Sequence, residues 1–105
     1  MAKRIVIRPK ASLDIDECFA YIAQENPETA LIFFDSIRET FAQLARMPGM
    51  GSRYPLDNSR LHGLRKWVVK GFKSYLIFYC ERDESIEIIR ILHARQNIET
   101  ILDHE

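Results

Sequence analysis

The first half of the chain has the hydrophobic pattern of one short strand followed by two helices. Residues 4–8, which place three β-branched residues between two arginines and stop at Pro9, predict a strand. Apolar residues then recur at helical spacing over 12–26, where Ser12 is the expected N-cap, and again over 27–46. Because the two helical segments adjoin, we expect a helical hairpin whose apolar faces cover another layer of structure.

Capping and charge signals support these two helices. Asn26 is the expected N-cap of the second helix, and Pro27 occupies its first position, where a missing N–H costs nothing. Asp14, Asp16 and Glu17 follow Ser12 closely and fall in the first turns of the first helix, where carboxylates complement the helix dipole.

The second half has the pattern of β structure after a long loop. Residues 48–63 are rich in Gly, Pro, Asn, Asp and Ser, which indicates a loop. Three runs rich in Val, Ile, Tyr and Phe follow, over 64–70, 74–81 and 85–92. The short segments between them predict two hairpins, and therefore an antiparallel meander.

The order of these elements predicts a single two-layer α+β domain over residues 1–105. That order is β-α-α-β-β-β, with the helical hairpin packed on one face of the antiparallel sheet. After His93 the sequence is polar, but Ile98, Ile101 and Leu102 lie at helical spacing. This tail is expected to form either one short helix or a docked arm.

The composition is that of an ordinary globular domain. With 105 residues, 47% of them hydrophobic, the chain can bury a core without a disulfide or a metal. Its longest apolar runs, such as 76–80, are far shorter than the roughly 20 residues that span a bilayer, and Pro9 interrupts the N-terminal apolar stretch. We therefore expect a cytoplasmic protein with no membrane contact. Cys18 and Cys80 lie among apolar residues, and we expect both to be buried free thiols.

The charges cancel overall but are segregated along the chain. Lys plus Arg number 15, and so do Asp plus Glu. Residues 1–10 contain four bases and no acid, whereas 11–28 contain five acids and no base. Residues 46–73 contain seven bases and one acid, and 81–105 contain seven acids and three bases. A neutral chain lacks the global field of a nucleic-acid binder, so the pattern favours a protein partner, with solvated faces as the alternative.

No standard catalytic or cofactor-binding motif occurs in the sequence. Gly49 and Gly51 form a GxG without a preceding predicted strand, and no P-loop lysine motif exists. The three histidines, His62, His93 and His104, lack metal-ligand spacing, and no Gly-x-Ser-x-Gly elbow is present. We therefore expect no metal, no cofactor and no assigned catalytic residue. Metal-free phosphodiester chemistry stays open, because it needs only a few convergent side chains.

Several segments taken together identify a family. In the second half they are Pro48-Gly49-Met50-Gly51-Ser52-Arg53, Gly63-Leu64-Arg65-Lys66-Trp67-Val68-Val69, Tyr75-Leu76-Ile77-Phe78-Tyr79 and Ile88-Ile89-Arg90-Ile91-Leu92-His93-Ala94-Arg95-Gln96. In the first half they are Asp14-Ile15, Tyr21-Ile22 and the stripe of Ala30, Phe33, Ile37, Phe41 and Leu44. In this order and spacing the chain resembles the ParE branch of the ParE/RelE toxin superfamily over nearly its whole length. The predicted order of elements agrees with the fold of that family.

The resemblance implies the toxin of a type II toxin–antitoxin module, held inactive by a ParD-like antitoxin. ParE toxins inhibit DNA gyrase by stabilising its cleaved complex with DNA, whereas RelE toxins cut messenger RNA on the ribosome. RelE nucleases hold the phosphate with basic residues and use a C-terminal acid, often Tyr, to protonate the leaving oxygen. This chain has no tyrosine after Tyr79, and its tail offers only Glu99. We therefore expect inhibition of gyrase by binding, with a ribosome-dependent endoribonuclease as the alternative.

Arg53, Arg65, His93 and Arg95 are the candidate target- or partner-binding residues. Arg65 either presents a bidentate guanidinium to a carboxylate or phosphate, or is an exposed strand residue. Arg53 either orders the glycine-rich loop through an ion pair or contacts a partner. His93 and Arg95, at the end of the last predicted strand, either act in binding or acid–base chemistry or hold the tail in place. For Trp67 we expect a position in the core or facing the antitoxin.

Overall fold

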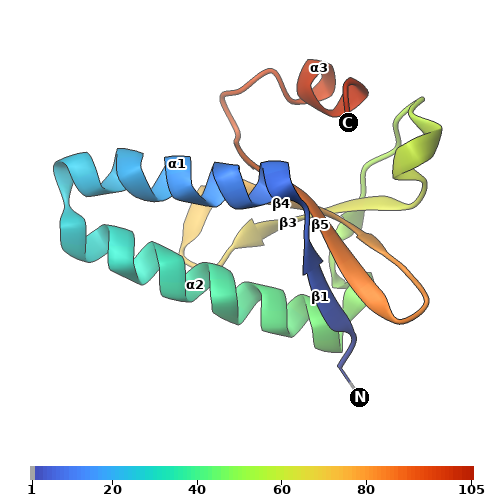
Figure 1. Cartoon of the computed structure of the whole chain (residues 1–105), viewed down its shortest axis with the longest axis horizontal. Helices are drawn as coiled ribbons and strands as arrows, with labels where there is room; N and C mark the ends of the chain where they lie inside the picture. Colours follow the sequence, from blue (N-terminus) through green and yellow to red (C-terminus); the bar gives the residue numbers. More distant parts are fainter. Residues whose placement is uncertain (1) are drawn as a thin grey trace.

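Helices lie on both faces of a five-stranded sheet (Figure 1). The computed structural model describes residues 2–105. Its elements are β1 (Arg4–Ile7), α1 (Pro9–Glu25), α2 (Pro27–Arg46), η1 (Pro48–Met50), β2 (Ser52–Arg53), η2 (Ser59–Leu61), β3 (Leu64–Val69), β4 (Phe72–Glu81), β5 (Ser85–His93) and α3 (Ile98–Asp103). The predicted α+β architecture, with a helical hairpin on one face of the sheet, is confirmed. No helix within the described residues is long and apolar enough to cross a membrane.

The first helix begins earlier than its sequence pattern suggested. The Arg8 carbonyl accepts the N–H of Ser12 at 3.0 Å, so α1 starts at Pro9 and Ser12 is not its N-cap. Proline favours this position because its φ is already helical and it has no N–H to leave unpaired. The second helix follows the prediction, since Asn26 Oδ1 accepts the N–H of Thr29 at 3.1 Å.

The sheet matches the predicted meander in its centre and differs from it at both edges. The strand order is β1-β5-β4-β3-β2, and the β3–β4 and β4–β5 pairs are antiparallel as expected. The segment expected to be only a loop contains β2, which pairs with β3; two residues are too few to show a periodic pattern. At the other edge, β1 runs parallel to β5, so the sheet is not purely antiparallel.

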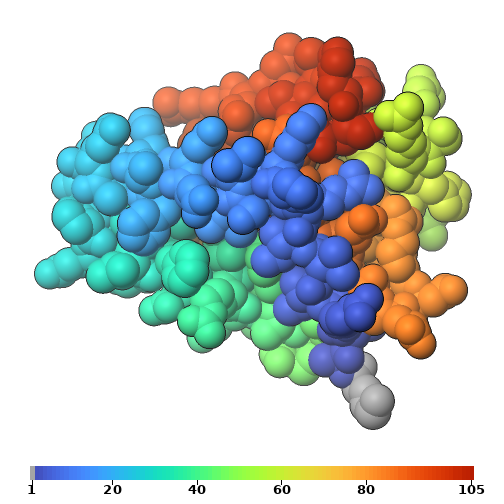
Figure 2. Space-filling model, viewed as in Figure 1, coloured from blue at the N-terminus to red at the C-terminus, as the bar shows by residue number. Residues whose placement is uncertain are grey.

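The strand β1 is an exposed edge of the sheet. Figure 2 shows its atoms, in dark blue, uncovered on the face that α1 and α2 share. The side chains of Ile5, Val6 and Ile7 are 36%, 36% and 43% exposed. Three neighbouring apolar residues on a strand that has a partner on one side only form a surface open to another chain.

Each face of the sheet has its own apolar core. Under the helical hairpin, the core includes Phe33, Ile37, Phe41, Leu44, Ile77, Tyr79, Ile88 and Ile91, with half-buried Trp67 packed against it. On the opposite face, Leu102 of α3 covers a smaller core of Leu61, Leu64, Phe78, Cys80, Ile89 and Leu92. The tail is therefore a short helix that docks on the sheet, which agrees with the prediction.

One charged cluster ties α1, β5 and the tail together. Asp14 receives two hydrogen bonds from Arg90, from Nε at 2.7 Å and from Nη2 at 2.8 Å, and a third from the backbone N–H of Ile91 at 3.0 Å. Arg90 also contacts Glu105, which pairs with Lys10 near the start of α1. Because α1 begins at Pro9, Asp14, Asp16 and Glu17 all lie beyond its first turn, and the dipole role expected for them is wrong. The Asp14 carboxylate is instead buried and bound to β5.

Candidate functional site

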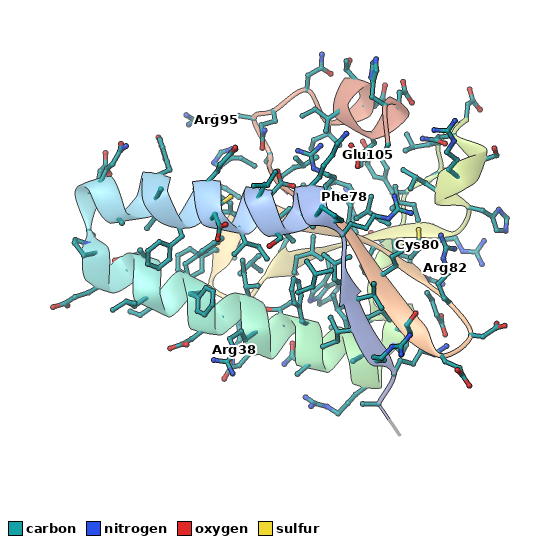
Figure 3. All side chains as sticks on the ribbon, viewed as in Figure 1. Arg38, Phe78, Cys80, Arg82, Arg95 and Glu105 are labelled. Atoms are coloured by element: carbon teal, nitrogen blue, oxygen red, sulfur yellow. The ribbon has the colours of Figure 1, made fainter. Side chains whose placement is uncertain are left out.

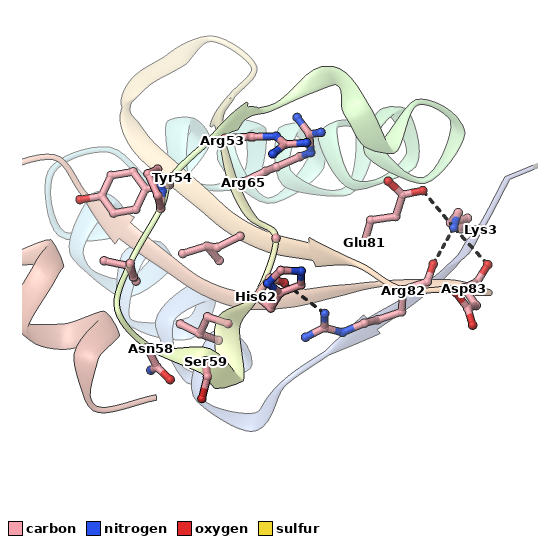
Figure 4. Close-up of a pocket in the computed structure, with 15 residues that line it drawn as sticks. Lys3, Arg53, Tyr54, Asn58, Ser59, His62, Arg65, Glu81, Arg82 and Asp83 are labelled. Atoms are coloured by element: carbon pink, nitrogen blue, oxygen red, sulfur yellow. Dashed lines mark hydrogen bonds and ion pairs between the residues drawn. The ribbon is translucent and has the colours of Figure 1, made fainter.

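Two arginines lie side by side where the glycine-rich loop joins the sheet (Figure 4). Arg53 of β2 is directly opposite Arg65 of β3. The Arg65 guanidinium is half-buried and donates from Nη1 to the Gly51 carbonyl at 2.6 Å, which fixes its direction. Within residues 2–105 neither arginine forms an ion pair with a carboxylate. The ion pair considered for Arg53 is therefore not found.

A buried tyrosine holds this loop in place. The Tyr79 hydroxyl donates to the Pro48 carbonyl at 2.7 Å and accepts the N–H of Gly51 at 2.9 Å. A Cβ atom on Gly51 would lie 2.5 Å from this hydroxyl and 2.7 Å from the Lys66 carbonyl, so only glycine fits here. Burial raises the pKa of Tyr79, partly offset by the Gly51 hydrogen bond and the charge of Arg65. The hydroxyl therefore stays protonated and keeps both contacts near neutral pH.

A cleft of about 730 Å³ opens beside the arginine pair. Lys3 and Arg82 also line it, and each has a carboxylate partner, although Arg82 shares its partner with Arg8. Lys3 Nζ lies 3.0 Å from the Glu81 carboxylate, and Arg82 Nε lies 3.3 Å from the Glu87 carboxylate. Figure 4 shows Lys3 bound to Glu81 and the Arg82 guanidinium close to the His62 carbonyl. Arg53 and Arg65 therefore differ from Lys3 and Arg82 in having no carboxylate partner within the described residues.

The other two candidate residues lie at the opposite end of the strands. His93 is the last residue of β5, and its ring meets that of Tyr75 edge to face, with centroids 5.0 Å apart. Its Nδ1 accepts the backbone N–H of Arg95 at 3.0 Å, which assigns the proton of the neutral ring to Nε2. The Arg95 side chain is exposed and points away from the body of the protein (Figure 3). His93 therefore shapes the turn that presents Arg95.

The four candidate residues thus form two separate pairs. Arg65 is opposite Tyr79 on β4, whereas His93 is opposite Tyr75. Four residues of strand correspond to roughly 13 Å, and β3 and β5 flank β4 on different sides. A general acid must come within hydrogen-bond reach of the reacting group, so His93 cannot serve a phosphate held by Arg65.

Metal and thiol chemistry find little support in this structure. The described residues contain no group of three His, Cys, Asp or Glu side chains that could hold a metal ion. Cys80 is buried as expected, but Cys18 is only half-buried, so the expectation of two buried thiols is correct for one of them. Burial, reinforced by Asp14 and Glu17, raises the pKa of Cys18 to about 11, and burial also raises the pKa of Cys80. Both thiols are therefore protonated and poorly nucleophilic near neutral pH.

Sequence reasoning missed the residues that shape the cleft. Tyr79 was expected only as part of a strand, and its hydroxyl contacts lie about thirty positions away along the chain. Lys3 Nζ donates to the Arg82 carbonyl, and this contact is possible only because β1 pairs with β5. The one local signal was Gly51, since a glycine in a loop often marks a close approach of the backbone to another group.

The sequence profile of one family matches most of the chain. That family is described as the ParE toxin of the type II toxin-antitoxin system parDE, and the match covers residues 5–98. This chain belongs to the ParE toxin family. As a ParE toxin it is a component of a type II toxin–antitoxin system, and membership implies a ParD antitoxin as its partner.

The fold of this ParE toxin has a counterpart among solved structures. A chain from the chromosomal ParDE toxin–antitoxin system of P. aeruginosa is 22% identical and superposes with a TM-score of 0.68. The match covers 88% of this chain and 96% of the other, so the two share a fold over nearly their whole length. No curated protein is significantly similar to this chain in sequence.

Proposed function

We propose that this ParE toxin inhibits DNA gyrase by binding it, without catalysis, and that a ParD-like antitoxin neutralises it. The observation that supports binding over catalysis is the separation of the Arg53–Arg65 pair from His93 and Arg95. A binding inhibitor uses charged contacts spread over a surface. A nuclease needs a proton donor beside the phosphate that it cleaves. Separate basic groups at two ends of the sheet therefore support inhibition by binding.

The second candidate function is a ribosome-dependent endoribonuclease. Its support is that His93 and Arg95 are adjacent, with the Nε2–H of the neutral imidazole left to act as a donor. For His93 to act as an imidazolium acid, however, Nδ1 would also carry a proton, and the hydrogen bond from the Arg95 N–H would be lost.

The target is tested with purified toxin in two assays. We expect inhibition of gyrase supercoiling with accumulation of cleaved DNA, and no cleavage of messenger RNA in a translation extract. Codon-specific cuts detected by primer extension, with gyrase unaffected, would establish the endoribonuclease instead.

The mechanism is tested by substitutions at the His93 end of the sheet. His93→Gln keeps a hydrogen-bonding side chain but removes proton transfer, which costs a nuclease roughly 10² to 10⁴ in rate and a binding inhibitor little. We expect His93→Gln to remain toxic in growth assays without antitoxin. We expect Arg95→Glu to lose toxicity while it stays folded by circular dichroism, because it reverses an exposed charge. The opposite pattern in two folded variants would contradict inhibition by binding.

For the antitoxin we propose a docking surface along the helical hairpin and the β1 edge. Five apolar side chains on the hairpin are between 42% and 67% exposed, namely Leu13, Tyr21, Leu31, Ile32 and Phe34. Together with the exposed apolar residues of β1 they give a long partner both an apolar surface and a free strand edge.

The charges beside β1 favour a foreign strand over a second copy of the same chain. Antiparallel self-pairing centred on Val6 would place Arg4 of one copy opposite Arg8 of the other, and like charges directly opposed are destabilising. A partner strand with acids flanking apolar residues avoids this repulsion. If the small protein encoded beside the toxin gene is co-expressed, we expect a complex that survives size-exclusion chromatography. Val6→Lys should then weaken the complex, and failure to recover any complex would refute the proposed partner.

A further inference from the structure

The helical hairpin carries exposed acids and no bases over most of its length. Between residues 11 and 37 the sequence contains no Lys, Arg or His. Five acids of this stretch are exposed and form no ion pair within residues 2–105, namely Asp16, Glu17, Glu25, Glu28 and Asp35. Charge of one sign repels itself, and protein surfaces ordinarily intersperse the two signs. The hairpin therefore has an uncompensated negative charge.

Helical spacing places two of these acids beside exposed apolar side chains. On α1, Glu17 lies four residues after Leu13, and on α2, Asp35 lies four residues after Leu31. Residues four apart share a face of a helix, so each acid is next to an apolar side chain. Leu13 and Leu31 are each 60% exposed. This surface is thus acidic and apolar at the same time, which is typical of an interaction surface rather than of a solvated charged face.

An apolar strip runs between the two helices. The rings of Phe19 on α1 and Phe34 on α2 meet edge to face, with centroids 6.3 Å apart. Phe19 is half-buried and Phe34 is 42% exposed. No other element crosses α1 and α2 on the face that Figures 1 and 2 show. An elongated apolar strip along two neighbouring helices accommodates a third helix, whose apolar side packs between them.

The sign of the charge decides between the candidate occupants. A nucleic-acid strand and an anionic membrane both carry negative charge, so the acids of the hairpin repel them. A second copy of this chain, packed hairpin on hairpin, would bring the same acids together. A partner helix with Lys or Arg beside its apolar side gains complementary charges instead. The occupant that these observations favour is a basic amphipathic helix of a partner protein.

We propose that the hairpin binds a basic amphipathic helix of the antitoxin, with its apolar side over the Phe19–Phe34 strip and its Lys or Arg side chains beside Glu17 and Asp35. This rests on the antitoxin docking proposed above and adds the chemistry of the segment that docks on the hairpin. The β1 edge has the opposite requirement, because the arginines at its two ends favour acids in a partner strand. The antitoxin therefore presents a basic helix and an acidic strand to two different surfaces of the toxin.

The test is an NMR titration of the purified chain labelled with ¹⁵N. The probe is a blocked peptide of about 18 residues, in which leucine recurs at helical spacing and lysine fills the other positions. The matched peptide has glutamate in place of lysine. We expect saturable shifts of backbone amides of α1 and α2 with the lysine peptide. We expect the glutamate peptide to bind roughly tenfold more weakly or worse, because it meets the acids of the hairpin with like charge.

Two pairs of variants separate the charges from the apolar contact. Glu17→Gln combined with Asp35→Asn should weaken the lysine peptide about tenfold. Its control is Glu99→Gln, at an exposed acid of α3, which should leave the affinity unchanged. Leu31→Ala should weaken the lysine peptide about fivefold, since it removes apolar contact area. Its control is Met47→Ala, at a side chain that is 63% exposed beyond the end of α2, which should leave the affinity unchanged.

The proposal is overturned if the two peptides bind equally, if the shifts lie outside α1 and α2, or if either test variant binds the lysine peptide as well as its control does. The docking of the antitoxin has a separate test, which is recovery of the complex by size-exclusion chromatography. A recovered complex combined with any of these negative peptide results would refute the basic helix and leave the antitoxin docking in place.

Discussion

Arg90 and the Arg53–Arg65 pair show two opposite uses of arginine in one small sheet. Arg90 lies between α1 and the tail and is matched by two carboxylates, those of Asp14 and Glu105. Its side chain is only 16% exposed. Arg53 and Arg65 instead face each other at the sheet edge with no carboxylate bound to either within the described residues.

The difference follows from solvent access. A charge removed from water is tolerated only when it is paired and hydrogen-bonded, so Arg90 has to be satisfied inside the protein. Hydrogen bonds to Asp14, with the charges of Asp14 and Glu105, outweigh burial and raise the pKa of Arg90. A charge that water still reaches can remain unpaired until a partner arrives. Paired arginine therefore serves the fold, and unpaired arginine is available for recognition.

The largest expected effect comes from breaking the paired cluster. Asp14→Ala removes both hydrogen bonds to Arg90 and leaves that guanidinium half-satisfied, so the free energy of unfolding should fall by about 3–5 kcal/mol. Asp16→Ala, at an exposed residue of the same helix, should change it by less than about 0.5 kcal/mol. Urea denaturation followed by circular dichroism measures both. Equal losses of unfolding free energy in the two variants would mean that Asp14 does not stabilise the protein through its contacts with Arg90.

A smaller loss is expected when the support of the unpaired arginines is removed. Tyr79→Phe leaves the Gly51 N–H and the Pro48 carbonyl without their buried partner, which should cost about 1–3 kcal/mol. Tyr54→Phe is the matched control, because the Tyr54 hydroxyl has no hydrogen bond within residues 2–105. Equal stability of the Tyr79→Phe and Tyr54→Phe proteins would show that the two hydrogen bonds of Tyr79 do not stabilise the loop.

A third effect appears only on acidification. Burial by itself would raise the pKa of Glu87, but hydrogen bonds and charges from Arg8 and Arg82 outweigh it and hold the pKa below its ordinary value of 4.5. A depressed folded-state pKa means that stability is present above the unfolded value and is lost as pH falls through the folded value. Glu87→Gln should therefore flatten the loss of stability below about pH 4.5 in denaturation curves. An identical pH profile in wild type and variant would argue against this pairing.

The smallest expected effect has the opposite sign. Arg53→Glu replaces a like-charged cross-strand pair with an opposite-charged one, and should raise the free energy of unfolding by about 0.2–1 kcal/mol. Arg60→Glu, at another exposed arginine, should leave the free energy of unfolding unchanged. A destabilised Arg53→Glu protein would show that the two guanidinium groups do not repel each other.

Local pattern was enough to predict the parts of the fold that depend on near neighbours. The α2 helix has an N-cap at Asn26 and a continuous apolar stripe, and both signals lie within the helix itself. The β3–β4 and β4–β5 hairpins follow from short connections between apolar runs. The start of α1 was misplaced because Ser12 and Pro9 are both acceptable helix-start residues, and only the Arg8 carbonyl decides between them.

The features that were missed depend on residues far apart in the chain. Nothing near Asp14 signals that its partner is Arg90, and nothing near Tyr79 signals the glycine loop. The same limit applies to the candidate site. Sequence identified Arg53, Arg65, His93 and Arg95 by type and by family resemblance, but only the strand register separates them into two pairs.

The parallel pairing of β1 with β5 also has a consequence for synthesis of the toxin. Arg4 pairs with Ser85 and Ile7 with Ile88. Because β1 is the first of the five strands to be synthesised and β5 the last, β1 cannot pair with its neighbour until β5 has been made. Such long-range pairing slows folding, and until β5 emerges the apolar side of the helical hairpin lacks part of its cover. A growing polypeptide therefore completes its five-stranded sheet only after β5, the last of the five strands in the chain, has been made.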